Sequence, residues 1–252
     1  MVIDCMDCTE TSKPTISAPE PRQNWALFLD IDGTLIDIKP SPEAVEVPAT
    51  LPSVLERARD WLGGALAVVS GRPIGQIDAL MAPLKLPCAG EHGAVLRKPD
   101  GSVVRPSGAL GVPRAWMAHA KSVAGQWKGV LVEDKDFVLS VHYRQAPESK
   151  DDVHALLQSI VAADPEEFEI LTTKMGFEIR HRHATKAAAV TGLMDSEPFA
   201  GRIPVFIGDD VTDEDGFRAA RKMGGLGLHV AEAFGGHASC VREWLRGFGG
   251  KA

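Results

Sequence analysis

Residues 27–35 read Leu27-Phe28-Leu29-Asp30-Ile31-Asp32-Gly33-Thr34-Leu35, and this stretch decides the fold. Residues 26–29 are apolar without alternation, which is typical of a strand buried on both faces of a parallel sheet. Asp30 and Asp32 come directly after this strand, at the carboxyl end where open α/β sheets bind ligands. Their side chains should project the same way until the chain turns at Gly33. Two converging carboxylates can hold a divalent cation or divide the roles of nucleophile and proton carrier.

Two other kinds of structure could contain such a stretch. An Asp-Gly turn that simply ends a strand is common and needs no function. An EF-hand calcium loop is excluded, because its glycine should be sixth and its glutamate twelfth. Counting from Asp30, Gly33 is fourth and Ser41 is twelfth.

The composition is typical of a globular protein with an excess of acidic over basic residues. The 252 residues are 44% hydrophobic and 24% charged, with a formal net charge of −7. This length suits one large domain or a core with a smaller insertion, and the charge argues against a nucleic-acid partner. There is no basic run for a membrane surface, no apolar span and no evident signal peptide, so a cytoplasmic monomer without membrane contact is expected. Residues 1–23 are expected to form a flexible tail, in which the C-x-x-C spacing of Cys5 and Cys8 is incidental.

Two different patterns of strands and helices divide the rest of the chain. Strand–helix units with buried apolar strands occupy residues 24–107 and 181–252, which predicts an α/β core with a parallel sheet. One of its expected strands spans residues 87–95 and carries Glu91-His92-Gly93 at its end. Residues 108–180 instead alternate in the order α-β-β-α-β-β. That order predicts an antiparallel sheet with helices on one side, inserted into the core as a cap domain.

Chemically suggestive residues follow the strands or open the helices of the expected core. They are Asp30 with Asp32, then Ser70, then Lys186, then Asp209 with Asp213. Each has an innocent explanation: Ser70 could cap a helix, Lys186 could be a solvated surface lysine, and the acids at 209–215 could compensate a helix dipole. Their joint occurrence in this order is much harder to dismiss.

In this order, the motifs resemble the four motifs of the haloacid-dehalogenase (HAD) superfamily of phosphatases. Within it, the chain is similar to the trehalose-6-phosphate phosphatase family over about residues 25–248. The finer resemblance rests on the segments 90–93, 133–135, 140–144, 174–180 and 208–215, with Arg97. One departure is visible: Lys186 is followed by Ala187 rather than Gly, and the Pro-x-Gly turn usual before the lysine is absent.

The resemblance implies a HAD-like Rossmannoid core with a C2-type αββαββ cap, and a Mg²⁺-dependent phosphatase acting on a small sugar phosphate. Asp30 would be the nucleophile, Asp32 the general acid and base, and Ser70 and Lys186 the phosphate ligands. The metal would be held by Asp30, Asp209 and the Asp32 carbonyl, with Asp213 binding through water or orienting the ligands. The implied substrate-binding residues are Gly71, Arg72, Glu91, His92, Arg97, Glu133, Lys135, His142, Arg144, Lys174, Glu178 and Arg180.

Two alternatives stay open from the sequence. One is a phosphatase of the same superfamily for another sugar phosphate, of the sucrose-phosphate or mannosyl-phosphoglycerate type, which the cap motifs disfavour. The other is a catalytically idle protein that senses a trehalose phosphate. Such a protein would have no need to keep all five core residues Asp30, Asp32, Ser70, Lys186 and Asp209.

Overall fold

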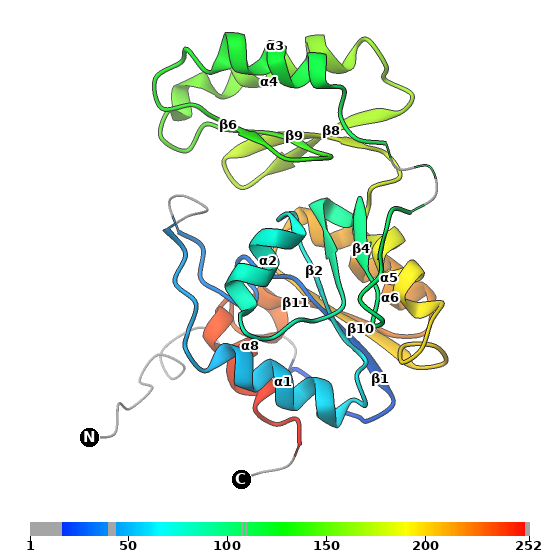
Figure 1. Ribbon diagram of the computed structural model, residues 1–252. Coiled ribbons are helices and arrows are strands. Elements are labelled where there is room, and N and C mark those ends of the chain that lie inside the picture. Colours follow the sequence, from blue (N-terminus) through cyan, green and yellow to red (C-terminus); the bar gives the residue numbers. More distant parts are fainter. Residues whose placement is uncertain (1–16, 40–43, 107, 109, 250–252) are drawn as a thin grey trace, which may run out of the picture.

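The computed structural model describes residues 17–39, 44–106, 108 and 110–249, which form a core with a smaller layer above it (Figure 1). The core holds a seven-stranded sheet in the order β11 (Leu226–His229), β10 (Ile203–Gly208), β1 (Trp25–Leu29), β2 (Leu66–Val69), β3 (Cys88–Gly90), β4 (Val95–Arg97) and β5 (Val103–Val104). The first five strands are parallel, whereas β4 and β5 pair antiparallel. The expected α/β core with a parallel sheet is confirmed.

The central strand β1 explains why the chemistry lies at one edge of this sheet. All five residues of β1 are buried, as the unbroken apolar run predicts. Parallel neighbours β2 and β10 flank it, so all three strands end on the same side. Asp30, Ser70 and Asp209 are the residues that directly follow β1, β2 and β10. The topology therefore brings together residues that are far apart in the sequence.

Helices cover both faces of the core sheet. They are α1 (Leu51–Trp61), α2 (Ile74–Met81), α5 (Lys186–Met194), α6 (Glu214–Lys222), the short α7 (Val230–Ala233) and α8 (Ala238–Leu245). Parallel crossovers are right-handed, and the α1 and α6 connections run in opposite directions along the sheet, so the two helices cover opposite faces. Helix α8 packs with α1, and α5 packs with α6. Helix α5 begins at Lys186, with the Thr185 hydroxyl capping it by accepting from Ala188 N at 3.0 Å.

The upper layer is an antiparallel sheet with two helices on its outer face (Figure 1). Its strands are β6 (Leu131–Asp134), β7 (Leu139–His142), β9 (Gly176–His181) and β8 (Phe168–Thr173), in that order across the sheet. Helices α3 (Arg114–Ala124) and α4 (Lys150–Val161) lie above it, so the other face of the sheet looks toward the core. The order α3-β6-β7-α4-β8-β9 confirms the αββαββ cap. The domain limits at residues 107/108 and 180/181 stay a prediction.

The structure differs from the expected strand at residues 87–95. Strand β3 ends at Gly90, a 3₁₀ turn η3 (Glu91–Gly93) follows, and β4 starts at Val95. Glu91 and His92 have positive φ angles of 49° and 59°, which a strand cannot contain. The single expected strand is therefore two antiparallel strands joined by a left-handed turn.

The chain before β1 also departs in part from the expected flexible tail. Among the described residues, Ala18 packs against the core and the Pro19 carbonyl accepts a hydrogen bond from Trp244 Nε1 at 2.9 Å. Ala18 and Pro19 are therefore held against the core, because an apolar side chain and a half-buried indole donor both find partners there. Cys5 and Cys8 lie outside the described residues. Within the described part of the chain, none of the helices has the length and apolar character needed to span a membrane.

Candidate active site

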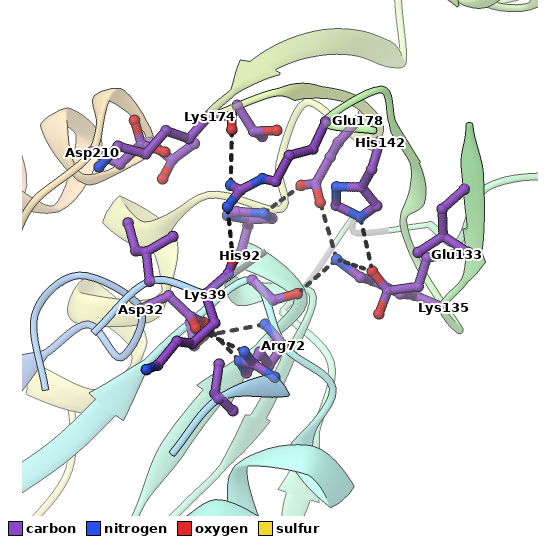
Figure 2. A pocket seen from close by; sticks show the side chains of 18 of the residues that line it. Asp32, Lys39, Arg72, His92, Glu133, Lys135, His142, Lys174, Glu178 and Asp210 are labelled. Atoms are coloured by element: carbon purple, nitrogen blue, oxygen red, sulfur yellow. Dashed lines mark hydrogen bonds and ion pairs between the residues drawn. The ribbon is translucent and has the colours of Figure 1, made fainter. Parts of the chain in front are cut away.

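A cavity of about 590 Å³ lies between the strand ends of the core and the inner face of the cap (Figure 2). Most of the expected site residues line it. They are Asp30, Asp32, Ser70, Gly71, Arg72, His92, Glu133, Lys135, His142, Arg144, Lys174, Glu178, Lys186 and Asp209. Core and cap thus share one cavity, with the carboxylates on its floor and the cap residues on its roof.

Asp30 and Lys186 lie on the floor of this cavity, and Asp213, which does not line it, is buried against Lys186. Lys186 Nζ donates to Asp30 Oδ1 at 2.8 Å and to Asp213 Oδ1 at 2.5 Å. Burial alone would lower the pKa of Lys186, but Asp213 and Asp30 raise it above its ordinary value, so the lysine is cationic. Burial and the neighbouring Asp213 raise the pKa of Asp30 well above its ordinary value. The lysine side chain orients the Asp30 carboxylate from one side.

Asp30, Asp209 and Asp213 also form a carboxylate cluster that fits a divalent cation. Carboxylate oxygens of all three lie within 4.8 Å of one another. Asp209 Oδ1 is buried and has no hydrogen-bond partner among the described residues, and burial raises the pKa of Asp209. Oxygen ligands of this kind suit Mg²⁺, whose charge would offset their mutual repulsion. The donor set therefore fits the expected metal.

Asp213 differs from the other two acids, because both of its oxygens already have protein partners. Its Oδ1 accepts from Lys186, and its Oδ2 accepts from the backbone N–H groups of Asp209 and Asp210 at 3.1 and 3.0 Å. The residue lies in the 3₁₀ turn η5 (Val211–Asp213) and is fully buried. This arrangement favours a role for Asp213 in orienting the residues around a cation, and leaves Asp30 and Asp209 to bind the cation directly.

Gly33 lets the acids of two strands approach one another closely. Its φ angle is +84°, and a Cβ atom built on it would lie 2.0 Å from Asp209 Oδ2. No side chain could fit at that distance, and only glycine adopts this φ readily. The turn after β1 is therefore shaped by the carboxylate of the neighbouring strand β10.

Asp32 and Arg72 form an ion pair on the wall of the cavity. Arg72 Nε donates to Asp32 Oδ2 at 2.6 Å, and Nη2 donates to Asp32 Oδ1 at 2.7 Å. Gln76 supports the guanidinium from α2 by accepting from Nη1 at 3.3 Å. Such a two-pronged pair fixes the plane of the carboxylate. Beside it, Ser70 is buried, and its hydroxyl accepts from Arg72 N at 3.2 Å.

Glu178 is the centre of the polar network on the roof (Figure 2). Its Oε1 accepts from Ser140 Oγ at 2.5 Å and from Lys135 Nζ at 3.0 Å, and its Oε2 lies 2.6 Å from His92 Nε2. Burial alone would raise the pKa of Glu178, but Lys135 and His92 lower it well below its usual range. Because an ionised carboxylate only accepts, His92 donates through Nε2. Burial lowers the pKa of His92, so the ring is neutral.

Further polar groups of the cap extend this network across the cavity. His142 Nε2 lies 3.2 Å from Glu133 Oε2, and Lys174 Nζ donates to Asp209 Oδ2 at 3.2 Å. Arg144 donates to the Lys39 carbonyl at 2.7 Å and to the Lys174 carbonyl at 3.2 Å. The roof therefore presents both cationic donors and anionic acceptors to the cavity. It contacts the floor through the ion pair between Lys174 and Asp209.

Three residues expected to bind the sugar lie away from the cavity. Arg97 donates to the Leu86 carbonyl and pairs with Asp78 in the core. Arg180 pairs with Glu169 and Asp215, and so joins β8 to α6. Glu91 accepts from two backbone amides of the cap. All three are buried with these partners, so their side chains are not placed to touch a ligand in the cavity.

Some residues that line the cavity are not among those predicted from the sequence. Leu131 could have been found, because it alternates with Glu133 and Lys135 along one face of β6 and its turn. Gln145 and Thr173 neighbour residues of the expected site. Others carry no sequence signal, since they come from loops or helix starts whose position depends on the whole fold. These are Ile38, Lys39, Val45, Gln76, Gly129 and Val130. Asp210 and Thr212, which also line the cavity, belong to the segment 208–215 on which the resemblance rests.

Known structures share this fold. A trehalose-6-phosphate phosphatase C-terminal domain from C. albicans superposes with a TM-score of 0.72 at 18% identity, covering 88% of this chain and 91% of that one. A trehalose-6-phosphate phosphatase related protein gives a TM-score of 0.68 at 22% identity, covering 87% and 95%. At these identities the likeness shows the fold, which is the HAD-like α/β core with an inserted cap that the sequence predicts.

Sequence relatives narrow this class to one family. The profile of the family described as Trehalose-phosphatase matches residues 28–239. A probable trehalose-phosphate phosphatase from Sinorhizobium fredii is 41% identical over 89% of this chain and 86% of the relative. The trehalose-6-phosphate phosphatase of Escherichia coli is 36% identical, over 87% and 82%. The chain belongs to the trehalose-phosphatase family.

Proposed function

We propose that this chain hydrolyses trehalose 6-phosphate to trehalose and phosphate in a Mg²⁺-dependent reaction, the last step of trehalose synthesis. The observation that carries this proposal is the division of one cavity into two halves. The floor holds a nucleophile, a lysine and paired acids, which suits a phosphate, and the roof holds the network around Glu178, which suits many hydroxyl groups. Both halves come from one chain, which supports function as a monomer.

Asp30 is the proposed nucleophile. Its carboxylate attacks phosphorus, the bond from phosphorus to the sugar oxygen breaks, and an aspartyl-phosphate forms. Lys186 lies beside the Asp30 carboxylate and offsets the charge of the phosphoryl oxygens, with the Ser70 hydroxyl as a further donor. Asp30 and Asp209 would hold the metal, oriented by Asp213. When bound, Mg²⁺ supplies positive charge that lets a carboxylate approach a phosphate dianion.

Asp32 is the proposed proton carrier. It gives a proton to the departing sugar oxygen, and then takes one from the water that hydrolyses the aspartyl-phosphate, which returns Asp30 to its ionised form. Arg72 holds the carboxylate of Asp32 in place on the cavity wall. The cap covers the floor, which limits the entry of other water while the covalent bond exists.

Phosphate release from a panel of sugar phosphates, with and without Mg²⁺, tests this proposal. We expect trehalose 6-phosphate to be the best substrate, ahead of sucrose 6-phosphate and mannosyl-phosphoglycerate. EDTA should abolish the reaction and Mg²⁺ should restore it, whereas Ca²⁺ should substitute poorly, because its larger shell draws in more ligands. Full activity after exhaustive chelation, or an equal rate on all three substrates, would contradict the proposal.

A further inference from the structure

The turn at residues 91–93 has positive φ angles at two adjacent non-glycine residues. Glu91 and His92 have φ angles of 49° and 59°, and Gly93 has one of 103°. Two adjacent non-glycine residues seldom adopt this conformation unless surrounding contacts hold them there. A Cβ atom on Gly93 would lie 2.4 Å from the Thr185 carbonyl, directly before Lys186, so the turn is pressed against the start of α5.

Glu91 uses this unusual conformation to reach the cap. One carboxylate oxygen, Oε2, accepts from Phe137 N at 2.7 Å and from Val138 N at 3.1 Å. Glu91 is 2% exposed and does not line the cavity. Phe137 and Val138 pack with Ala94 and other apolar residues of the junction between core and cap, where an unpaired amide would be costly. The carboxylate therefore satisfies two backbone donors at this junction.

The two anchored amides end the turn that carries Lys135. This turn joins β6 to β7, and Lys135 lies two residues before Phe137. From there Lys135 Nζ reaches Glu178 Oε1 at 3.0 Å and the Gly71 carbonyl at 3.2 Å, so it touches both cap and core (Figure 2). A lysine has a long flexible stem, and its reach depends on where the backbone of the turn is held.

We propose that Glu91 is a positioning residue, which pins the 135–138 turn of the cap to the core and thereby holds Lys135 beside Glu178. It acts through Lys135 and does not touch the sugar, in contrast to the contact expected from the sequence. The neighbouring His92 contacts Glu178 directly, so one short turn of the core fixes the sugar half of the cavity at two points. The inference rests on the proposed function, because it assigns that half of the cavity to the sugar.

A pair of variants separates the reach of Glu91 from its charge. Glu91→Gln keeps the length and an acceptor oxygen, whereas Glu91→Asp keeps the charge but is one methylene shorter. We expect Glu91→Asp to lower kcat/KM on trehalose 6-phosphate at least about tenfold, chiefly through KM, and Glu91→Gln to stay within about threefold of wild type. Both should hydrolyse a small aryl phosphate within about threefold of wild type, since that substrate makes little use of the cap. Glu148→Asp, at an exposed glutamate of the cap, is the matched control and should change neither reaction.

Hydrogen–deuterium exchange supplies a readout that does not depend on the substrate. The amides of Phe137 and Val138 should exchange faster in Glu91→Asp than in wild type or Glu91→Gln. Equal exchange in all three, or a larger kinetic loss in Glu91→Gln than in Glu91→Asp, would overturn the inference. A wild-type protein with no activity on trehalose 6-phosphate would instead refute the proposed function, and the exchange comparison would still decide whether Glu91 holds the turn.

Discussion

Glu178 of the cap and His92 of the core meet at 2.6 Å between Oε2 and Nε2, and both side chains are buried. This contact crosses the boundary between the two layers at the roof of the cavity. Lys135 and Ser140 hold the other oxygen of Glu178, so this one carboxylate links two cap strands, a cap turn and the core. Two consequences follow, one for the pH dependence of stability and one for substrate choice.

The pH dependence of stability should reflect the neutral state of His92. Burial lowers its pKa from the ordinary 6.5, so below that pH the unfolded chain binds a proton that the folded protein does not yet accept. Stability from this site is therefore present above pH 6.5 and is lost as the pH falls toward the lowered pKa. Glu178 acts in the same direction at lower pH, because its folded pKa lies well below its ordinary value.

Urea unfolding at pH 7.5, 6.5 and 5.5 measures this effect. The free energy of unfolding of the wild type should fall across the series, and the fall should be smaller in His92→Gln. His119→Gln is a control at an exposed histidine of α3 and should keep the wild-type slope. The same slope in His92→Gln and wild type would show that His92 is not held neutral.

The nucleophile is tested by Asp30→Asn, which keeps the shape of the side chain but removes the attacking charge. We expect kcat to fall by at least about 1,000-fold on both trehalose 6-phosphate and an aryl phosphate. Lys186 keeps Asp213 as a partner, so the fold should survive, which circular dichroism can verify. Asp195→Asn, at the exposed end of the same helix α5, serves as the control. Near-normal turnover in Asp30→Asn would remove the covalent mechanism.

The close approach at Gly33 can be tested against a second glycine of nearly equal φ. Gly33 and Gly101 have φ angles of +84° and +83°, but a Cβ atom meets Asp209 only at Gly33 and meets nothing within 4 Å at Gly101. Each alanine should cost about 1–2 kcal/mol of stability through its left-handed backbone. Only Gly33→Ala should also displace Asp209, and we expect it to lower activity at saturating Mg²⁺ by at least about a hundredfold. Equal activity in the two variants would mean that the spacing of the acids is not critical.

Local sequence patterns predict much of the fold and most of the residues on the floor of the site. The apolar run before Asp30 predicts a buried strand of a parallel sheet. Because the carboxyl ends of parallel strands lie at one edge of a sheet, Ser70 and Asp209 are then expected beside Asp30. Period-two alternation also predicts that Ser140, His142 and Arg144 share one face of their strand, and that Glu178 and Arg180 share one face of theirs. The register places Ser140 directly opposite Glu178, where they form a hydrogen bond.

The remaining differences come from long-range contacts. Glu91 has no residue-type preference for a left-handed turn. Both Glu91 and His92 contact the cap from this turn, with partners that are 46 and 86 residues away in the sequence. Arg97 and Arg180 have charged side chains of the kind expected of residues that bind a sugar phosphate. Their acidic partners, Asp78 and Asp215, become neighbours only in the folded chain. A charge in a sequence motif does not show whether its partner is a substrate or another side chain.

The central claim is that the floor performs the chemistry while the roof selects the sugar, and Glu178→Ala measured on two substrates tests it most directly. Removal of this carboxylate takes away the acceptor of Ser140 and one of the two acceptors of Lys135, and a charged hydrogen bond is worth about 1.5–3 kcal/mol. We predict that kcat/KM on trehalose 6-phosphate falls at least about tenfold, while kcat/KM on a small aryl phosphate stays within about threefold of wild type. Equal losses on the two substrates would contradict the account, because the cap would then not be the part that recognises the sugar.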